Sequence, residues 1–329
     1  MLNVIRIPKA LIAIGSTLLA GTLAFADPAQ WERQGWSTNF EKISVDPSEV
    51  LSGGPPKDGI PSIDDPQFIP VSESGDLDDR EPVIGLEIDG DARAYPIRIL
   101  TWHEIVNDTV GGRAVAVTYC PLCNAALTFD RTLDGEPVEF GTTGKLRNSD
   151  LIMYDRKSES WWQQFTGEAI AGDRLGETLP LVPSRLESWA QFKERHPEGQ
   201  VLVPNDPSLR NYGRNPYVNY DTAAAPFLYR GDVPDNVMPM ERVVVVRTPD
   251  GEPEVVTLAH VRENGPITLG GAEVTWSEGQ ASALDTAEIA EGREIGTIIA
   301  QRNGQDVSYD VTFAFVAHAF HPEVPIRTE

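Results

Sequence analysis

The feature of this sequence that most limits its possible folds is a set of landmarks that recurs, in the same order, in the second half of the chain. The matched pairs are Asp89-Gly90 with Asp250-Gly251, Gly111-Gly112 with Gly270-Gly271, Val117-Thr118-Tyr119 with Val274-Thr275-Trp276, Ala126-Leu127 with Ala283-Leu284, and His196-Pro197 with His321-Pro322. Internal similarity of this kind indicates a repeated structural unit. We therefore expect two related lobes.

The segments between these landmarks are typical of short strands. Residues 82–89 and 93–97 flank an Asp-Gly turn, which is a strong hairpin signal. Residues 113–119 alternate in a strand-like pattern, and short helices are expected over 99–106 and from Ser184, where a capping box is present. With 28 Gly and 26 Pro among 329 residues, the chain is rich in turns. We predict an α+β fold that is mostly β, with two related β-rich lobes and short helices.

The landmarks also divide the chain into segments. We expect a signal peptide at 1–26, an extended N-terminal arm at 27–80, a first lobe at 81–203, a linker or crossover at 204–239 and a second, degenerate lobe at 240–329. The second lobe has Ser277-Glu278-Gly279-Gln280 where the first has a cysteine pair, and it lacks a counterpart of the segment that begins at Gly141 and runs past Trp162. We therefore expect the chemistry in the first lobe and a scaffold in the second.

The first 26 residues predict export. Arg6 and Lys9 precede an apolar stretch, and Ala24-Phe25-Ala26 fits a cleavage site for a secretory signal. We expect a periplasmic or secreted protein with no membrane span after cleavage. The chain has 27 basic and 50 acidic residues, a net charge of −23, which argues against nucleic acid and anionic lipid as partners.

The only two cysteines, Cys120 and Cys123, are three positions apart. A disulfide between them would close a very small loop and would stabilise the fold little. A redox pair would use one cysteine as a nucleophile, although residues 125–130 favour a strand rather than the helix on which such pairs usually lie. A metal site would combine the two thiolates with His103 and another donor, and this ligand set suits copper or zinc.

The leading hypothesis is therefore a thiol-redox or metal-binding protein centred on Cys120 and Cys123, with a metal or a redox partner protein as its partner. Whether it is an enzyme stays open, because the sequence contains no recognisable catalytic triad or zinc-protease motif.

The alternative hypothesis is a non-catalytic periplasmic binding module for a small polar or carbohydrate-like molecule. Trp161 and Trp162 could stack on a flat ligand if one of them is exposed. The loop at 141–150 carries Lys145, Arg147, Asn148 and Asp150. It lacks the spacing of a nucleotide phosphate loop, but it could bind an anion.

Several longer motifs resemble one bacterial exported family. They are GGPPKDGIP at 53–61, WHEIVND at 102–108, YCPLC at 119–123, FGTTGKLRNSD at 140–150, SWWQQ at 160–164 and AFHP at 319–322. The family is catalogued as domain of unknown function 3179. The resemblance implies a single architecture over residues 40–325 and carries no established activity.

Overall fold

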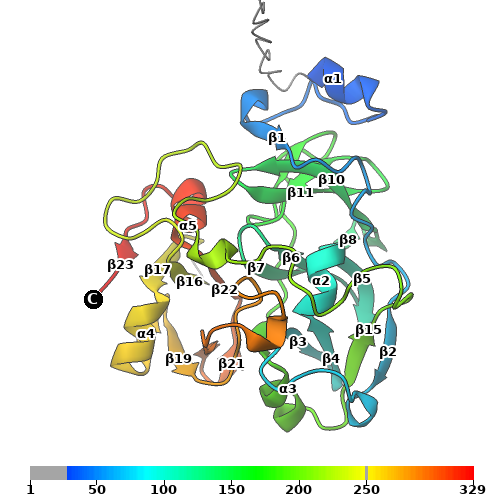
Figure 1. The fold of residues 1–329 in the computed structure, drawn as a ribbon. Helices are drawn as coiled ribbons and strands as arrows, with labels where there is room; N and C mark the ends of the chain where they lie inside the picture. Colours follow the sequence, from blue (N-terminus) through cyan, green and yellow to red (C-terminus); the bar gives the residue numbers. More distant parts are fainter. Residues whose placement is uncertain (1–27, 249–250) are drawn as a thin grey trace, which may run out of the picture.

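The computed structural model describes residues 28–248 and 251–329. The expected signal peptide at 1–26 lies outside the described residues. The chain is mostly β, as predicted, with short α-helices and several small sheets (Figure 1). No helix in the described residues is long and apolar enough to cross a membrane.

The first lobe contains two sheets. Its elements are β3 (Pro82–Ile88), β4 (Asp91–Pro96), α2 (Ile97–His103), β5 (Ile105–Val110), β6 (Arg113–Cys120), β7 (Ala125–Asp130), β14 (Arg185–Ser188), α3 (Trp189–Arg195) and β15 (Gln200–Val203). The strand order of the larger sheet is β14-β3-β4-β15-β2, in which β2 (Gln67–Pro70) comes from the arm and β4 and β15 are parallel. The smaller sheet is the antiparallel β5-β6-β7.

The second lobe repeats this arrangement. Its elements are β16 (Arg242–Arg247), β17 (Pro253–Thr257), α4 (Leu258–Asn264), β18 (Ile267–Leu269), β19 (Ala272–Ser277), β20 (Thr297–Arg302), β21 (Gln305–Asp306), β22 (Tyr309–Phe313), α5 (Ala314–Phe320) and β23 (Ile326–Arg327). The strand order is β22-β16-β17-β23, again with one parallel pair, beside β18-β19-β20-β21. The two lobes therefore have the same topology.

Most of the matched landmarks occupy equivalent places. Gly111 and Gly112 turn the chain between β5 and β6, and Gly270 and Gly271 do the same between β18 and β19, all with positive φ. The match of Ala126-Leu127 with Ala283-Leu284 is wrong. The first pair lies in β7, whereas the second lies in the longer connection at 278–296 that precedes β20.

The first lobe differs from the second by an insertion. Between β7 and β14 the chain forms β8 (Thr132–Leu133), β9 (Glu136–Pro137), β10 (Phe140–Arg147), β11 (Asp150–Asp155), β12 (Trp161–Gln163) and β13 (Ala169–Ala171). The second lobe has only β21 between β20 and β22. The insertion builds a third sheet, β1-β10-β11-β12-β13, in which β1 (Val50–Ser52) comes from the arm. It lies above the first lobe in Figure 1.

Residues 28–80 are integrated into the fold. After α1 (Pro28–Arg33), this arm gives β1 to the insertion sheet and β2 (Gln67–Pro70) to the edge of the first lobe, where it pairs with β15. The arm crosses β10 closely: the N–H of Gly53 donates to the carbonyl of Gly144 at 2.9 Å. Gly144 has φ +68°, and a Cβ there would lie 2.0 Å from the carbonyl oxygen of Pro55. This close approach requires glycine.

The helix expected from Ser184 begins later. Residues Arg185–Ser188 pair with β3, so the strand continues to Ser188. Ser188 then caps α3, and Gln191 completes a capping box with it. Pairing with β3 satisfies the backbone groups of this segment and outweighs its local helical preference.

Candidate functional site

The two cysteines lie on the tight turn between β6 and β7. Cys120 is paired with Ala125, the N–H of Cys123 donates to the carbonyl of Cys120 at 3.2 Å, and Asn124 has a left-handed φ of 52°. Both cysteines are free thiols, so the structure contains no disulfide between them. The strand predicted after them is confirmed, which removes the helix N-terminus on which a thioredoxin-like site depends. The turn instead presents two sulfur atoms together, as in a metal knuckle.

The second lobe fixes this turn in place. Thr312 Oγ1 donates to the carbonyl of Cys123 at 2.7 Å, and Asn124 Nδ2 donates to the carbonyl of Val311 at 2.7 Å. The N–H of Ala126 donates to Asp310 Oδ1 at 3.3 Å. Three consecutive residues of β22 therefore hold the turn that carries the cysteines. The second lobe therefore contributes directly to the position of the cysteine turn.

Asp150 is the third member of the site. One of its carboxylate oxygens and the two sulfur atoms all lie within 4.8 Å of one another, and all three residues are buried. Its Oδ2 accepts hydrogen bonds from Gln163 Nε2 at 2.6 Å and from the N–H of Phe165 at 2.9 Å. Its Oδ1 is buried and has no hydrogen-bond partner in the described part of the chain. The carboxylate is therefore oriented by two donors, and it also interacts with the thiols of Cys120 and Cys123, which lower its pKa.

Burial determines the electrostatics of the site. Burial raises the pKa of both thiols, that of Cys123 most strongly. Burial also raises the pKa of Asp150 to about 6, although the hydrogen bonds from Gln163 and Phe165 lower it. Within residues 28–248 and 251–329, no Lys or Arg forms an ion pair with Asp150. A metal ion would supply the charge that this group of acids lacks.

Glu104 is a further buried acid in this part of the molecule. It follows α2 with a φ of 60°, and its carbonyl accepts a hydrogen bond from the N–H of Tyr119 at 2.8 Å. Its side chain is buried, and burial together with the charge of Asp150 raises its pKa to about 8. Glu104 therefore interacts electrostatically with Asp150, but it is not among the donor atoms that lie within 4.8 Å of one another.

His103 does not belong to the site, contrary to the sequence-based expectation. Its Nδ1 is hydrogen-bonded to the carbonyl of Pro61 and its Nε2 to the hydroxyl of Tyr212, each at 2.7 Å. The Tyr212 ring also stacks on it. With both ring nitrogens committed to these partners, His103 has no nitrogen left for a metal.

We predict that Glu104→Gln changes the pH dependence of stability of the metal-free protein. Between the ordinary pKa near 4.5 and the folded value of about 8, the folded state holds a proton that the unfolded state has released. The contribution of Glu104 to the free energy of unfolding therefore falls as pH rises through this window, by a few kcal/mol at most.

The measurement is urea denaturation in the presence of a chelator at several pH values from 5 to 8. The variant should lose less stability than the wild type across this range. Parallel curves for the two proteins would contradict the prediction. Asp150, Cys120 and Tyr217 interact electrostatically with Glu104, and they are unchanged in the variant.

The other expected binding residues are not gathered at one anion site. Lys145 lies in β10, where burial lowers its pKa. Arg147 forms an ion pair with Glu49, with Nε and Oε2 2.6 Å apart. Asn148 has a left-handed φ of 53° in the turn that leads to β11. Residues 141–145 form part of a bulged strand and not an anion-binding loop. Of this set, only Asp150 reaches the cysteines.

The two tryptophans are both fully buried. Trp161 packs against Trp31, Trp36 and Phe40 of the arm, with ring centroids 4.8, 5.1 and 4.9 Å away. Trp162 donates from Nε1 to Asp155 Oδ2 at 3.0 Å. Neither ring is available to stack on a ligand, so the expectation of an exposed aromatic platform is wrong. The arm buries the face of Trp161 that would have to be exposed for a ligand to stack on it under the alternative hypothesis.

Residues 204–239 cross over the cysteine turn, with one 3-10 turn at Tyr220–Thr222. The hydroxyl of Tyr220 donates to the carbonyl of Leu122 at 3.0 Å, and Ser149 Oγ donates to the carbonyl of Phe227. These contacts bind the crossover to the cysteine turn and to the residue before Asp150. The crossover therefore covers the site.

These features define a class of two-lobed, mostly β protein with a buried Cys-Cys-Asp site between the lobes and an inserted sheet. The chain belongs to the family described as Protein of unknown function (DUF3179), whose sequence model matches residues 57–324. Comparisons with curated proteins and with solved structures found no match.

Proposed function

We propose that this protein binds a thiophilic metal ion, best matched by Zn²⁺, through Cys120, Cys123 and Asp150. The observation that carries the proposal is the meeting of two sulfur atoms and an oriented carboxylate within 4.8 Å in a buried site. Zinc prefers four tetrahedral ligands drawn from sulfur, nitrogen and carboxylate oxygen. A water molecule would be the fourth ligand. The carboxylate favours zinc over Cu⁺, which selects softer donors.

The state of the thiols supports metal binding over redox chemistry. A reactive cysteine needs a lowered pKa and access to solvent, whereas both thiols here are buried with raised pKa values. A metal ion displaces the thiol protons when it binds. Two thiolates and one carboxylate would then surround the divalent ion.

The test is calorimetric titration of the reduced protein with Zn²⁺ in two buffers with different enthalpies of protonation. The proposal expects one ion per chain and release of about two protons near neutral pH, one from each thiol. If the protein binds Cu⁺ in preference to Zn²⁺, the proposed ligands stand and the assignment of the metal is wrong. Absence of stoichiometric binding of either ion would contradict the proposal.

We predict that Thr312→Val weakens zinc binding by about 10- to 100-fold, which is the usual effect of removing a group that orders a ligand. The substitution keeps the shape of the side chain but removes the hydrogen bond to the carbonyl of Cys123. The measurement is competition with a chromophoric chelator. Thr109→Val, at an exposed position in β5, is the matched control and should bind as the wild type does. Equal affinity of Thr312→Val and the wild type would show that β22 does not order the site.

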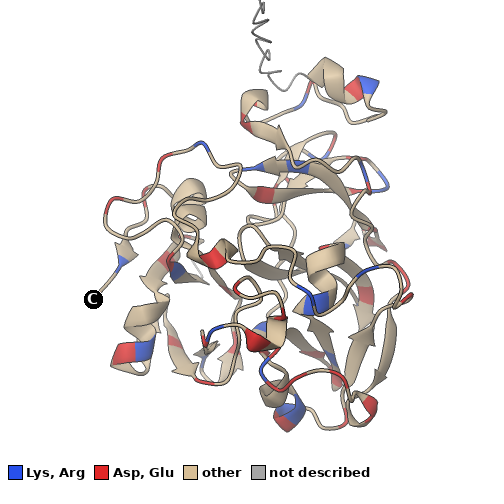
Figure 2. Cartoon of the chain, viewed as in Figure 1, with Lys and Arg blue, Asp and Glu red and all other residues tan. Residues whose placement is uncertain are grey.

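We further propose that the protein works in the periplasm or outside the cell, with a metal-donating or metal-accepting partner. The leader motif at residues 1–26 supports the export part of this proposal. Figure 2 shows Lys and Arg scattered among acidic residues over the described chain, an arrangement that offers little to a nucleic acid backbone.

A further inference from the structure

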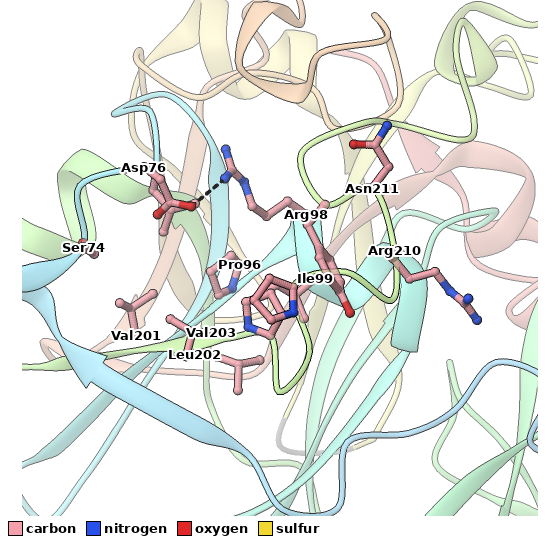
Figure 3. Close-up of a pocket in the computed structure, with 14 residues that line it drawn as sticks. Ser74, Asp76, Pro96, Arg98, Ile99, Val201, Leu202, Val203, Arg210 and Asn211 are labelled. Atoms are coloured by element: carbon pink, nitrogen blue, oxygen red, sulfur yellow. Dashed lines mark hydrogen bonds and ion pairs between the residues drawn. The ribbon is translucent and has the colours of Figure 1, made fainter.

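A cavity of about 420 Å³ lies where the arm, helix α2, strand β15 and the start of the crossover meet. Its size is in the range of small-molecule sites. Figure 3 shows its lining, with the Arg98 side chain extended toward Asp76. Neither the cysteines nor Asp150 line this cavity, so the inference below is independent of the proposed metal site.

One side of the cavity is apolar. The residues that form it are Pro96, Ile99, Val201, Val203, Pro204 and Pro207. Val201 and Val203 lie below the Arg98 guanidinium in Figure 3. Such a surface accommodates a short hydrocarbon or aromatic body and gains free energy by removing it from water.

Arg98 supplies a fixed polar anchor. Its Nε donates to Glu81 Oε2 at 2.7 Å, and its Nη2 donates to the other oxygen of the same carboxylate. Glu81 is buried. This two-point contact sets the plane of the guanidinium before any ligand arrives. Preorganisation of this kind lowers the entropic cost of binding.

The remaining nitrogen of Arg98 has a weak partner. Its Nη1 lies 3.4 Å from Asp76 Oδ2, and the Asp76 side chain is 85% exposed. An exposed ion pair contributes little to stability, so the displacement of Asp76 costs little. A ligand carboxylate could take its place and keep the Arg98 nitrogen paired.

Arg210 also lines the cavity, and no carboxylate in the described residues forms an ion pair with it. Figure 3 shows its side chain extending away from Arg98, so we assign it no contact with the ligand. Its neighbour Tyr212 has its hydroxyl bonded to His103. The cavity thus combines apolar lining residues with a guanidinium held in one orientation.

We propose that this cavity binds a small organic acid, whose carboxylate displaces Asp76 from Arg98 Nη1 and whose apolar body lies against the apolar side. Without a ligand, the carboxylate of Asp76 occupies the position beside Arg98 Nη1 that the ligand carboxylate would take. The ligand class is a monocarboxylate with an apolar body, as the lining indicates.

The test uses hexanoate, hexan-1-ol and hexylamine, which share one apolar body and differ in the head group. Binding to the full chain is followed by NMR titration of Tyr212 and the Arg98 Nε–H. Hexanoate should bind about tenfold or more tightly than either of the others. Asp76→Asn should tighten hexanoate binding several-fold, because the competing charge is removed. Asp79→Asn, a neighbouring exposed substitution outside the cavity lining, should leave binding unchanged.

Three results would overturn the proposal. They are equal binding of the three probes, weaker hexanoate binding by Asp76→Asn than by the wild type, and no hexanoate binding at millimolar concentration. Removal of Arg98 itself is a poor test, because it would leave Glu81 buried without its partner and could unfold the protein. The probe series and the Asp76 variant avoid that difficulty.

Discussion

Replacement of Cys123 by serine should lower the affinity for Zn²⁺ by a factor on the order of 10³. Cys123 is fully buried and offers one of the three donors that lie within 4.8 Å of one another. A serine hydroxyl has nearly the same size, but it does not lose its proton at neutral pH and so cannot replace a thiolate ligand. Cys120→Ser should have a similar effect, because the two sulfur atoms occupy one turn.

The measurement is competition for zinc between the protein and a chelator of known affinity. Zinc at about 100 times its Kd should raise the free energy of unfolding of the wild type by about 2.7 kcal/mol, and this increment should vanish in Cys123→Ser. The control is the stability of both proteins without metal, which should agree within about 1 kcal/mol. Zinc binding by Cys123→Ser at wild-type affinity would exclude the proposed ligand set.

The second prediction with a large expected effect is a loss of stability when the contact between Trp161 and the arm is removed. Trp161→Ala should lower the free energy of unfolding by about 3–5 kcal/mol, the usual cost of truncating a large buried aromatic side chain. Trp161 is fully buried and contacts three aromatic rings from residues 31–40. The variant would leave a cavity between the insertion sheet and the arm. The arm should then become more accessible to proteases.

Urea denaturation and limited proteolysis measure these two consequences. Met238→Ala is the control, because Met238 is 66% exposed and its truncation should change stability by less than about 0.5 kcal/mol. A loss below about 1 kcal/mol for Trp161→Ala, with unchanged proteolysis, would show that the aromatic cluster does not hold the arm.

Local signals in the sequence predicted much of the fold. The Gly-Gly turns and the His-Pro helix ends are set by backbone geometry within a few residues, so their recurrence revealed the related topology of the two lobes. The strand after Cys123 was also predicted, because residues 125–130 favour extended structure. The helix expected from Ser184 begins only after Ser188, because pairing with β3, about 100 residues away, extends the strand.

The site was predicted less completely, because its members come from distant segments. The cysteine pair was visible as the only two cysteines, and Asp150 was named as part of a binding loop but not as their neighbour. Glu104 was not singled out, because the adjacent His103 is the more usual ligand type. The burial of Trp161 depends on the arm, about 130 residues earlier, and no local pattern indicates that contact.

The most direct test of the central claim is X-ray absorption at the zinc edge on the protein loaded with one equivalent of Zn²⁺. The proposed site predicts two sulfur ligands at about 2.3 Å and one or two oxygen ligands at about 2.0–2.2 Å. The sulfur contribution should fall to one ligand or disappear in Cys123→Ser. A wild-type spectrum with only oxygen and nitrogen ligands would contradict metal binding at the cysteine turn.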